Sequence, residues 1–285
     1  MSKSLISILL PVHDDSPFLE KCLISLNKLT LPAFTELLVV LDRVSNRNLD
    51  LINKFSSPLR KKILLNNKQG LVESLNQGIV AAEGEYIARI DHDDMMESTR
   101  LEKQFVFLKN NSEYVLVGSN VTLIDHLDIP IRNSRYPTAH EEITKVLKHK
   151  NVLAHPSVMY RKSAVIKAHL YREFYEGAED YDLWMRLIRI GKVGNLAECL
   201  TFYRQHSGQM STKNLKKQWI ITEAVKTSAK LNDEMTLELD AKYKNIYDWY
   251  NQNLRVKLKY QIVRLRGLIN KVVLREYWSK IVKYK

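Results

Sequence analysis

Residues 84–94 read GEYIARIDHDD, a short apolar run from Tyr86 to Ile90 that ends in three aspartates within four residues. A run of this length between polar residues is typical of a buried β-strand. Apolar residues recur at helical steps before it, from Leu71 to Ala82, and after it, from Arg100 to Leu108. Strands and helices therefore alternate around the acidic segment, as a layered α/β fold requires.

The same alternation runs through the first 117 residues. Apolar runs predict strands at Leu5 to Val12, Leu37 to Leu41, Lys62 to Leu65, Tyr86 to Ile90 and Tyr114 to Val117. Helical spacing of apolar residues predicts helices at Phe18 to Leu29, Leu49 to Phe55, Leu71 to Ala82 and Arg100 to Leu108. This βαβ repeat predicts a mostly parallel sheet with helices on both faces.

Beyond Gly118 the periodicity weakens, and prolines interrupt it. Further helices are expected at Glu141 to Leu147, at Asp180 to Ile190 and from Leu215 onward. We expect an α/β domain over residues 1–212 and a helical, basic C-terminal extension over residues 213–285.

The composition indicates a globular chain with a polyanionic partner. A hydrophobic content of 45% is ample for a packed core, so disorder is not expected. The formal net charge of +12 and the pI near 9.5 favour nucleic acid, a phosphate-rich ligand or an anionic membrane surface as the partner.

The compartment is indicated by the two cysteines and the apolar runs. Cys22 and Cys199 each fall in an apolar pattern, so we interpret both as packing residues in a reducing compartment. The run from Leu5 to Val12 is too short for a signal peptide, and no stretch approaches the ~20 apolar residues of a membrane-spanning helix. We therefore expect a cytoplasmic protein.

Ligands of a parallel α/β sheet bind outside the carboxyl ends of its strands. The segments just past the predicted strands are Pro11 to Asp15, Asp42, Asn66 to Gly70, and Asp91 to Asp94, and three of these four carry carboxylates. The candidate site therefore lies at this edge of the sheet and is acidic.

The strongest local signal is the group Asp91, Asp93 and Asp94. Hard oxygen ligands at this density suit Mg²⁺ or Mn²⁺ with diphosphate oxygens completing the shell. A solvated acidic turn or an adventitious Ca²⁺ site would give the same pattern.

Two further strand ends could bind a nucleotide. Asp42 could accept hydrogen bonds from a base or a ribose hydroxyl, although an isolated aspartate is more often a helix N-cap or a turn former. Gly70 permits close backbone approach to an anion near a helix N-terminus, but a tight turn explains it nearly as well.

Four more polar residues lie outside the strand ends. Glu179 and Asp180 open a helical pattern, where carboxylates could either act chemically or complement the helix dipole. His155 and His206 fall in loops, where a histidine can be a metal ligand or simply solvated.

Taken together, these segments resemble the inverting GT-A glycosyltransferases of family 2, which include bacterial O-antigen and exopolysaccharide transferases. The resemblance spans roughly residues 5 to 212. Its motifs are LPVHD (residues 10–14), VVLD (39–42), GL (70–71) with LNQGI (75–79), GEYIARIDHDD (84–94), HPSVMYR (155–161), EDYDLW (179–184) and YRQH (203–206). The resemblance implies a GT-A catalytic domain over residues 1–212.

The resemblance also implies a role for each matching residue. Pro11 and Gly70 would border the nucleotide, Asp42 would bind the base, and Asp91 would approach the ribose or the donor sugar. Asp93 would bind the metal, Mn²⁺ or Mg²⁺, together with His206. Asp180 would be the general base, with Asp94, Glu179 and His155 as supporting or acceptor-side residues.

The chain departs from the family pattern at two strand ends. Many members have Asp-Asp-Gly-Ser where this chain has Leu41 to Ser45, and a Tyr-Asn where it has His13-Asp14. These departures bear on the loop geometry and on the strictness of base selection.

The C-terminal part of the sequence indicates that the protein binds an anionic acceptor or membrane surface. After Leu254, ten Lys and Arg residues are opposed only by Glu276, and apolar residues from Leu254 to Val272 follow a helical step. This pattern is typical of a helix lying in an anionic interface, or of a helix packed on the catalytic domain.

The implied reaction is transfer of a hexose from UDP-glucose or UDP-galactose, with β-linkage, to a lipid-diphosphate-linked saccharide at the inner face of the cytoplasmic membrane. The rival enzyme class is a nucleotidyltransferase acting on a sugar phosphate, but the first strand end is acidic rather than glycine-rich and basic. A nucleic-acid-binding protein would explain the pI but not the carboxylates at strand ends, so no nucleic-acid partner is expected.

Overall fold

The computed structural model describes residues 6–13, 16–30, 35–66, 68–206, 208, 215–228, 246–253, 255–258 and 261. The chain divides into two compact units, Met1–Leu215 and Lys216–Lys285.

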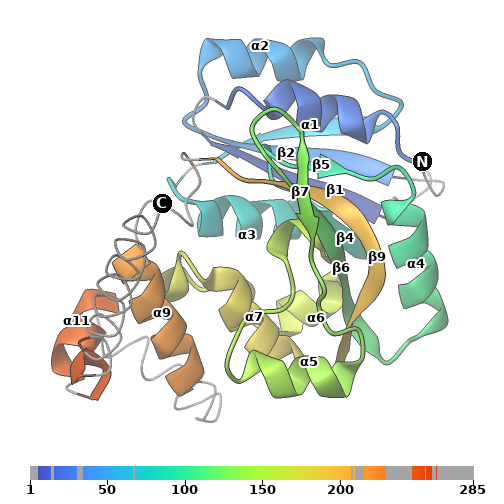
Figure 1. The fold of residues 1–285 in the computed structure, drawn as a ribbon. Helices are drawn as coiled ribbons and strands as arrows, with labels where there is room; N and C mark the ends of the chain where they lie inside the picture. Colours follow the sequence, from blue (N-terminus) through green and yellow to red (C-terminus); the bar gives the residue numbers. More distant parts are fainter. Residues whose placement is uncertain are drawn as a thin grey trace, which may run out of the picture. The chain divides into compact units, whose positions relative to one another are not determined.

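A single mixed sheet forms the centre of the first unit (Figure 1). Its strands are β1 (Ile6–His13), β2 (Thr35–Asp42), β3 (Arg60–Leu65), β4 (Tyr86–Arg89), β5 (Met95–Met96), β6 (Tyr114–Ile124), β7 (Pro130–Asn133), β8 (Met159–Arg161) and β9 (Lys192–Arg204). Within the described residues they follow the order β3-β2-β1-β4-β8-β6-β9-β5, and β7 pairs with β6.

Strands β3, β2, β1 and β4 run parallel to one another, and so do β6 and β9. Strand β8 lies between the two groups and is antiparallel to both β4 and β6. The short strands β5 and β7 pair antiparallel with β9 and β6. The predicted α/β fold with a mostly parallel sheet is thus confirmed.

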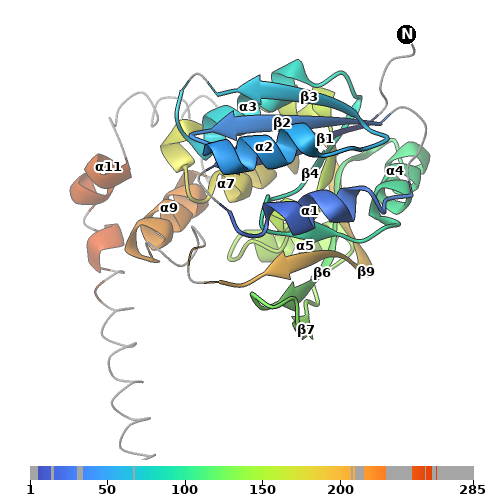
Figure 2. The same ribbon diagram turned by 90° about the horizontal axis from the view of Figure 1, so that it is seen from above.

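The helices of this unit cover both faces of the sheet, as predicted. They are α1 (Leu19–Leu26), α2 (Asn46–Lys54), α3 (Leu71–Ala81), α4 (Arg100–Asn110), α5 (His140–Leu147), α6 (Lys162–Lys167) and α7 (Glu179–Leu187), with 3₁₀ turns η1 (His155–Ser157) and η2 (Glu173–Tyr175). Helices α1 and α2 lie on one side of β1 and β2, and α3 lies on the other (Figures 1 and 2).

Alternation along β1 explains this arrangement. Ile8 and Leu10 belong to the core cluster that includes residues of α1, α2 and α4, and the intervening Leu9 points to the opposite face. There it meets α3, where a Cβ on Gly78 would lie 2.2 Å from Leu9 Cδ1. A glycine at this position therefore lets α3 approach the sheet closely.

Differences from the predicted elements concentrate after Gly118. The strand predicted to end at Val117 continues to Ile124, and β9 was not predicted although it has 13 residues. Strand β9 carries several polar side chains, and its register with β6 shifts near Ser119 and Asn120. A bulged, partly exposed strand lacks the clean apolar run by which the earlier strands were recognised.

The second unit contains α9 (Leu215–Ser228), apart from its first residue, and α11 (Ile246–Gln252). Their buried residues include Ile220, Val225 and Trp249. Most of the predicted amphipathic stripe after Leu254 lies outside the described residues. None of the helices that the structure describes is both long and apolar enough to cross a bilayer.

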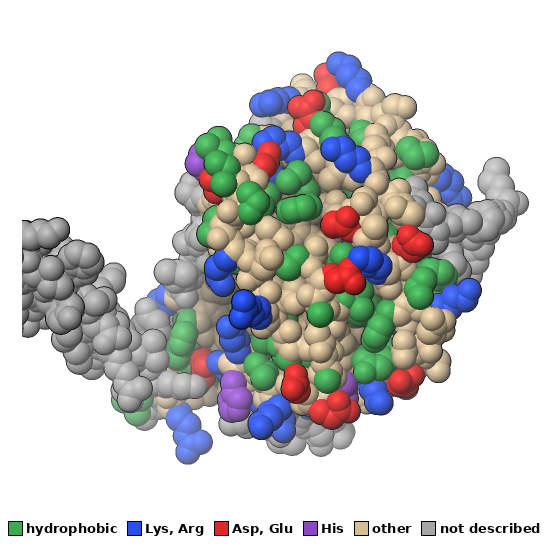
Figure 3. All heavy atoms as spheres, turned by 45° about the vertical axis from the view of Figure 1, so that its right-hand side comes forward, with side chains coloured by type: hydrophobic (Ala, Val, Ile, Leu, Met, Phe, Trp, Pro, Cys, Tyr) green, Lys and Arg blue, Asp and Glu red, His purple; other side chains and the backbone are tan. Residues whose placement is uncertain are grey.

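Charge is mixed on the face of the molecule shown in Figure 3. Acidic and basic side chains of the described residues are interspersed there, with hydrophobic side chains scattered between them. Among the residues drawn in colour, this face carries no large field of one sign.

Candidate active site

The carboxyl ends of the central strands meet at one edge of the sheet. His13 at the end of β1 is in register with Asp42 at the end of β2. On the other side of β1, Ile90 just past β4 donates its backbone N–H to the carbonyl of Leu9. The segments that the sequence singled out therefore converge on this edge.

The three aspartates after β4 form a compact acidic group. Ligand oxygens of Asp91, Asp93 and Asp94 lie within 4.8 Å of one another. Asp94 is buried, and its Oδ1 accepts the backbone N–H of Arg204 at 2.8 Å. Asp93 is partly exposed, and its Oδ2 lies 2.9 Å from Nε2 of His206.

The partners Arg204 and His206 lie at the end of β9 and just beyond it, more than a hundred residues after the aspartates in the sequence. Antiparallel pairing of β5 with β9 sets Met95 opposite Phe202, so the end of β9 lies beside the acidic segment. Arg204 Nε donates to the carbonyl oxygen of Asp93 at 2.7 Å, and its guanidinium lies 4.5 Å from the ring of Phe18. The loop with His206 is thereby anchored next to Asp93.

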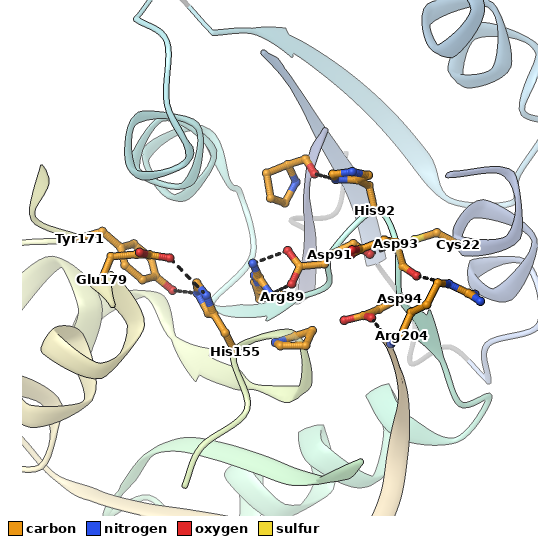
Figure 4. A network of polar contacts seen from close by, with 12 residues as sticks. Cys22, Arg89, Asp91, His92, Asp93, Asp94, His155, Tyr171, Glu179 and Arg204 are labelled. Atoms are coloured by element: carbon orange, nitrogen blue, oxygen red, sulfur yellow. Dashed lines mark hydrogen bonds and ion pairs between the residues drawn. The ribbon is translucent and has the colours of Figure 1, made fainter. Parts of the chain in front are cut away.

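Asp91 is held by an arginine from its own strand. Arg89 Nη1 donates to Asp91 Oδ2 at 2.5 Å, and Nη2 donates to the other carboxylate oxygen (Figure 4). This bidentate pair fixes the plane of the Asp91 carboxylate and leaves its outer lone pairs open.

The electrostatics of this group favour a bound cation. Burial, reinforced by repulsion from Asp93, raises the pKa of Asp91, and the same causes raise the pKa of Asp94 well above its usual value. Among the described residues, no donor reaches Asp94 Oδ2. Hard carboxylate oxygens, one of them unpaired, with a neighbouring imidazole fit a divalent metal such as Mn²⁺ or Mg²⁺.

Asp42 and Gly70, which the sequence put at neighbouring strand ends, are bonded to each other. Gly70 donates its backbone N–H to Asp42 Oδ2 at 2.8 Å and has φ of 125°, a conformation that favours glycine. Asp42 Oδ1 lies 3.6 Å from Nε of Arg43. Asp42 thus orders the entry to α3, and its expected role in binding a base stays a prediction.

Pro11 lies on β1 beside the acidic segment. Its carbonyl oxygen is 3.3 Å from Nδ1 of His92, which is itself edge-on to the ring of His13. Burial lowers the pKa of His92, so its neutral form is favoured. These contacts tie the end of β1 to the acidic loop.

The second acidic pair stands at the start of α7. Asp180 Oδ2 accepts from Asn151 Nδ2 at 2.8 Å, and its Oδ1 accepts the backbone N–H of Tyr181 at 2.7 Å. Glu179 is buried, and its Oε2 accepts the backbone N–H of Gly177 at 2.6 Å. Burial raises the pKa of Asp180 and, with repulsion from Asp180, raises the pKa of Glu179 to about 7.

His155 belongs to this second group rather than to the acidic loop. Its Nδ1 lies 3.8 Å from Glu179 Oε1, and its Nε2 lies 2.8 Å from the hydroxyl of Tyr171 (Figure 4). Burial lowers the pKa of His155 well below its usual value, and the nearby charge of Arg89 acts in the same direction. His155 is therefore a neutral, buried member of a hydrogen-bonded cluster.

The structure thus brings His206 to Asp93, Gly70 to Asp42, and His155 to Glu179. Sequence reasoning assigned no role to Arg89, Tyr171 or Arg204. A charged residue inside the apolar run of residues 86–90 was the available signal for Arg89. Nothing comparable marks Tyr171, because its contact with His155 depends on the loop fold.

Comparison with known proteins gives a family match. The model of glycosyl transferase family 2 matches residues 7–169. The O-antigen biosynthesis glycosyltransferase WbnJ of Escherichia coli is 36% identical over 137 residues, which are 47% of this chain and 53% of that protein. The amylovoran biosynthesis glycosyltransferase AmsE of Erwinia amylovora is 32% identical over 210 residues, covering 70% of this chain and 74% of that protein.

Solved structures give the fold. The crystal structure of S. aureus TarS 1-349 in complex with UDP-GlcNAc superposes with a TM-score of 0.63 and 17% sequence identity. The match covers 85% of this chain and 72% of that chain. Against WbnJ, by contrast, the matched segment spans about half of the relative's length.

Proposed function

The chain belongs to glycosyl transferase family 2, and we propose that it transfers a hexose from UDP-glucose or UDP-galactose to a saccharide hydroxyl, forming a β-linkage. The observation that carries this proposal is the pairing of Asp93 with His206 beside Asp91, at the same edge of the sheet as Asp42 and Gly70. Such an arrangement suits a nucleotide diphosphate.

The residues around Asp93 fit a divalent metal, Mn²⁺ or Mg²⁺. We assign Asp93 and His206 as its ligands, with Asp94 as a supporting carboxylate. When bound, the metal would neutralise the charge that develops on the departing diphosphate.

The nucleoside would lie along the ends of β1 and β2. In our assignment Pro11 and Gly70 border it, and Asp42 accepts a hydrogen bond from the base with the capacity that Gly70 leaves free. Arg89 fixes the plane of the Asp91 carboxylate, which accepts a hydrogen bond from the ribose or the donor sugar.

Asp180 is assigned as the general base. It removes the proton of the acceptor hydroxyl while that oxygen forms a bond to the anomeric carbon and the bond to the diphosphate oxygen breaks. Asn151 and the amide of Tyr181 orient its carboxylate, and Glu179 and His155 support it. One displacement of this kind inverts the anomeric carbon.

The acceptor that we propose is a saccharide on a polyprenyl diphosphate. Support comes from relatives named for O-antigen and amylovoran biosynthesis and from the basic excess after Leu254. In this proposal residues 1–212 catalyse, and residues 213–285 bind an anionic surface at the inner face of the cytoplasmic membrane.

Calorimetry tests the donor class directly. UDP and UDP-hexoses should bind with Mn²⁺ and lose most affinity without it, whereas a DNA oligomer should show no site that depends on Mn²⁺. Radiolabelled nucleotide-sugars would then be screened against a lipid-diphosphate GlcNAc acceptor. Failure of every UDP-sugar to bind, together with turnover of a sugar phosphate and a nucleoside triphosphate, would point to a nucleotidyltransferase instead.

A further inference from the structure

We propose that Arg89 is a positioning residue that serves both sides of the active site. Its guanidinium fixes the Asp91 carboxylate on the donor side and presents its positive charge to the Glu179–Asp180 pair on the acceptor side. The inference rests on the proposed function, which makes Asp180 the base and Asp91 a donor-binding residue.

Strand alternation places Arg89 between the two groups. On β4, Ala88 and the following Ile90 belong to the core cluster that α1 and α4 cover, so Arg89 points to the opposite face. There it lies between Asp91 on one side and the cluster of His155, Tyr171 and Glu179 on the other (Figure 4).

The hydrogen bonds of Arg89 serve to position the Asp91 carboxylate rather than to stabilise the fold. The side chain is only 2% exposed, yet Asp91 is the carboxylate that binds it, and its Nε–H meets no acceptor among the described residues. A buried arginine with an unpaired N–H gives little net stability compared with an apolar residue.

Arg100 shows the contrasting, structural case. It is fully buried as well, but its guanidinium donates to Gln104 and Thr201 side chains and to the carbonyls of Pro156, Val158 and Arg89. Arg100 thus joins neighbouring segments and contacts no carboxylate in the described part of the chain. It is the matched control for Arg89.

The charge of Arg89 reaches the acceptor side electrostatically. It lowers the pKa of both Glu179 and Asp180, against the larger effect of burial, which raises them. The other groups around Asp180 are Asn151, Glu179 and Tyr171, and His155 faces Glu179. Burial keeps His155 neutral, so within the described part of the chain Arg89 is the cation that acts on both acids.

The backbone leading to Tyr171 is strained and is held in place by hydrogen bonds. His169 and Leu170 have φ of 62° and 59°, a region that non-glycine residues rarely occupy. Asn76 of α3 then pairs with both the N–H and the carbonyl of Tyr171, at 2.9 Å each. The segment that carries Tyr171 is therefore fixed to α3.

The test uses the full chain without donor or metal for its first readout. The pKa of Asp180 is measured from the ¹³C carboxylate signal of aspartate-labelled protein, assigned by its loss in Asp180→Asn. Arg89→Gln removes a positive charge that lowers the Asp180 pKa, so this pKa should rise in the variant. Arg89→Lys keeps the charge and should leave it close to the wild-type value.

The second readout is the affinity for UDP in the presence of Mn²⁺. Both variants lose the bidentate hydrogen bonding to Asp91, so each should bind UDP about tenfold more weakly. Arg100→Lys is expected to lower the melting temperature while leaving the Asp180 pKa unchanged. Arg89→Met serves as the neutral variant if circular dichroism shows that Arg89→Gln does not fold.

An unchanged Asp180 pKa in a folded neutral variant would overturn the acceptor-side role, and wild-type UDP affinity in Arg89→Lys would overturn the donor-side role. A wild-type protein that binds no UDP at all would count against the proposed function instead. In that case the carboxylate titration still decides whether Arg89 acts on Asp180.

Discussion

Asp93 is the residue on which the metal assignment depends. Its carboxylate is partly exposed, faces His206 and has two further carboxylates beside it. Asp93→Ala should abolish turnover and the metal-dependent part of donor binding, because the charge of the diphosphate would be left uncompensated. Activity assays and calorimetry with Mn²⁺ measure both effects.

Retention of activity within about tenfold, a barrier change of only ~1.4 kcal/mol, would remove Asp93 from the metal site. The matched control is Asp125→Asn, which changes an aspartate whose side chain is bonded to the backbone N–H groups of Leu127 and Ile129 in the β6–β7 turn. This substitution should leave metal-dependent binding intact.

Asp180→Asn should lower the transfer rate by about 10² to 10⁴ while donor affinity changes little. Asparagine keeps the size of the side chain and one of its two acceptor oxygens but cannot take a proton. Glu179→Gln is the neighbouring control and should be milder, because Glu179 Oε2 is bonded to the backbone of Gly177.

The pH dependence of the transfer rate gives a second test of Asp180. A base must be deprotonated, so the rate falls as pH drops through its pKa. Because burial raises the pKa of Asp180, this acid limb should lie above the usual aspartate range near pH 4. Residual activity of Asp180→Asn should lack the limb, and an unaltered rate would mean that Asp180 only stabilises the first turn of α7.

At the scale of elements, α3 connects the sheet to the site. It packs on β1 through Gly78, and its start is ordered by the Asp42–Gly70 bond. Gly78→Ala adds a methyl group 2.2 Å from the buried Leu9 side chain. The strain of overpacking, about 1–3 kcal/mol, should exceed the gain in helix propensity of about 1 kcal/mol.

Denaturant unfolding of the two proteins measures this difference. Val80→Ala is the control on the same helix, since Val80 is 64% exposed, and it should change the free energy of unfolding by no more than about 0.5 kcal/mol. A Gly78→Ala protein as stable as wild type would show that Leu9 can move aside.

Elements with a clear local pattern of apolar residues were predictable from the sequence. Strands that form only by pairing with distant strands were not. Strands β1, β2 and β4 are buried apolar runs between turn residues, so local pattern alone found them. Strands β5 and β8 have two and three residues, and only their partners in the sheet make them strands.

The same distinction applies to the site. Asp91 and Asp93 stand at the end of a predicted strand, so their neighbourhood could be inferred. The motif resemblance added His206, but its position 2.9 Å from Asp93 depends on the pairing of β5 with β9. Arg204 was missed because a buried arginine that binds a backbone carbonyl leaves no periodic signal.

At the scale of the whole molecule, the basic excess after Leu254 predicts binding to anionic lipid. Deleting the residues after Leu254 should release the protein from anionic vesicles. Raising the salt concentration should weaken binding of the intact chain, because screening shortens the attraction between charges. Sedimentation with vesicles measures both effects.

Vesicles of neutral lipid are the control for the electrostatic contribution, and the deleted protein should keep its affinity for UDP with Mn²⁺. If the shortened chain sediments with anionic vesicles as the intact chain does, the C-terminal residues have a structural role. Loss of UDP binding on deletion would show that the two units are not independent in function.

The central claim is that a single displacement transfers the sugar with Asp180 as the base. The most direct test is the anomeric configuration of the product, read by NMR from the coupling constant of the newly linked sugar when the donor is an α-linked UDP-hexose. We predict a β-linked product, formed at a rate that falls sharply in Asp180→Asn. An α-linked product, or full activity of Asp180→Asn, would contradict the account.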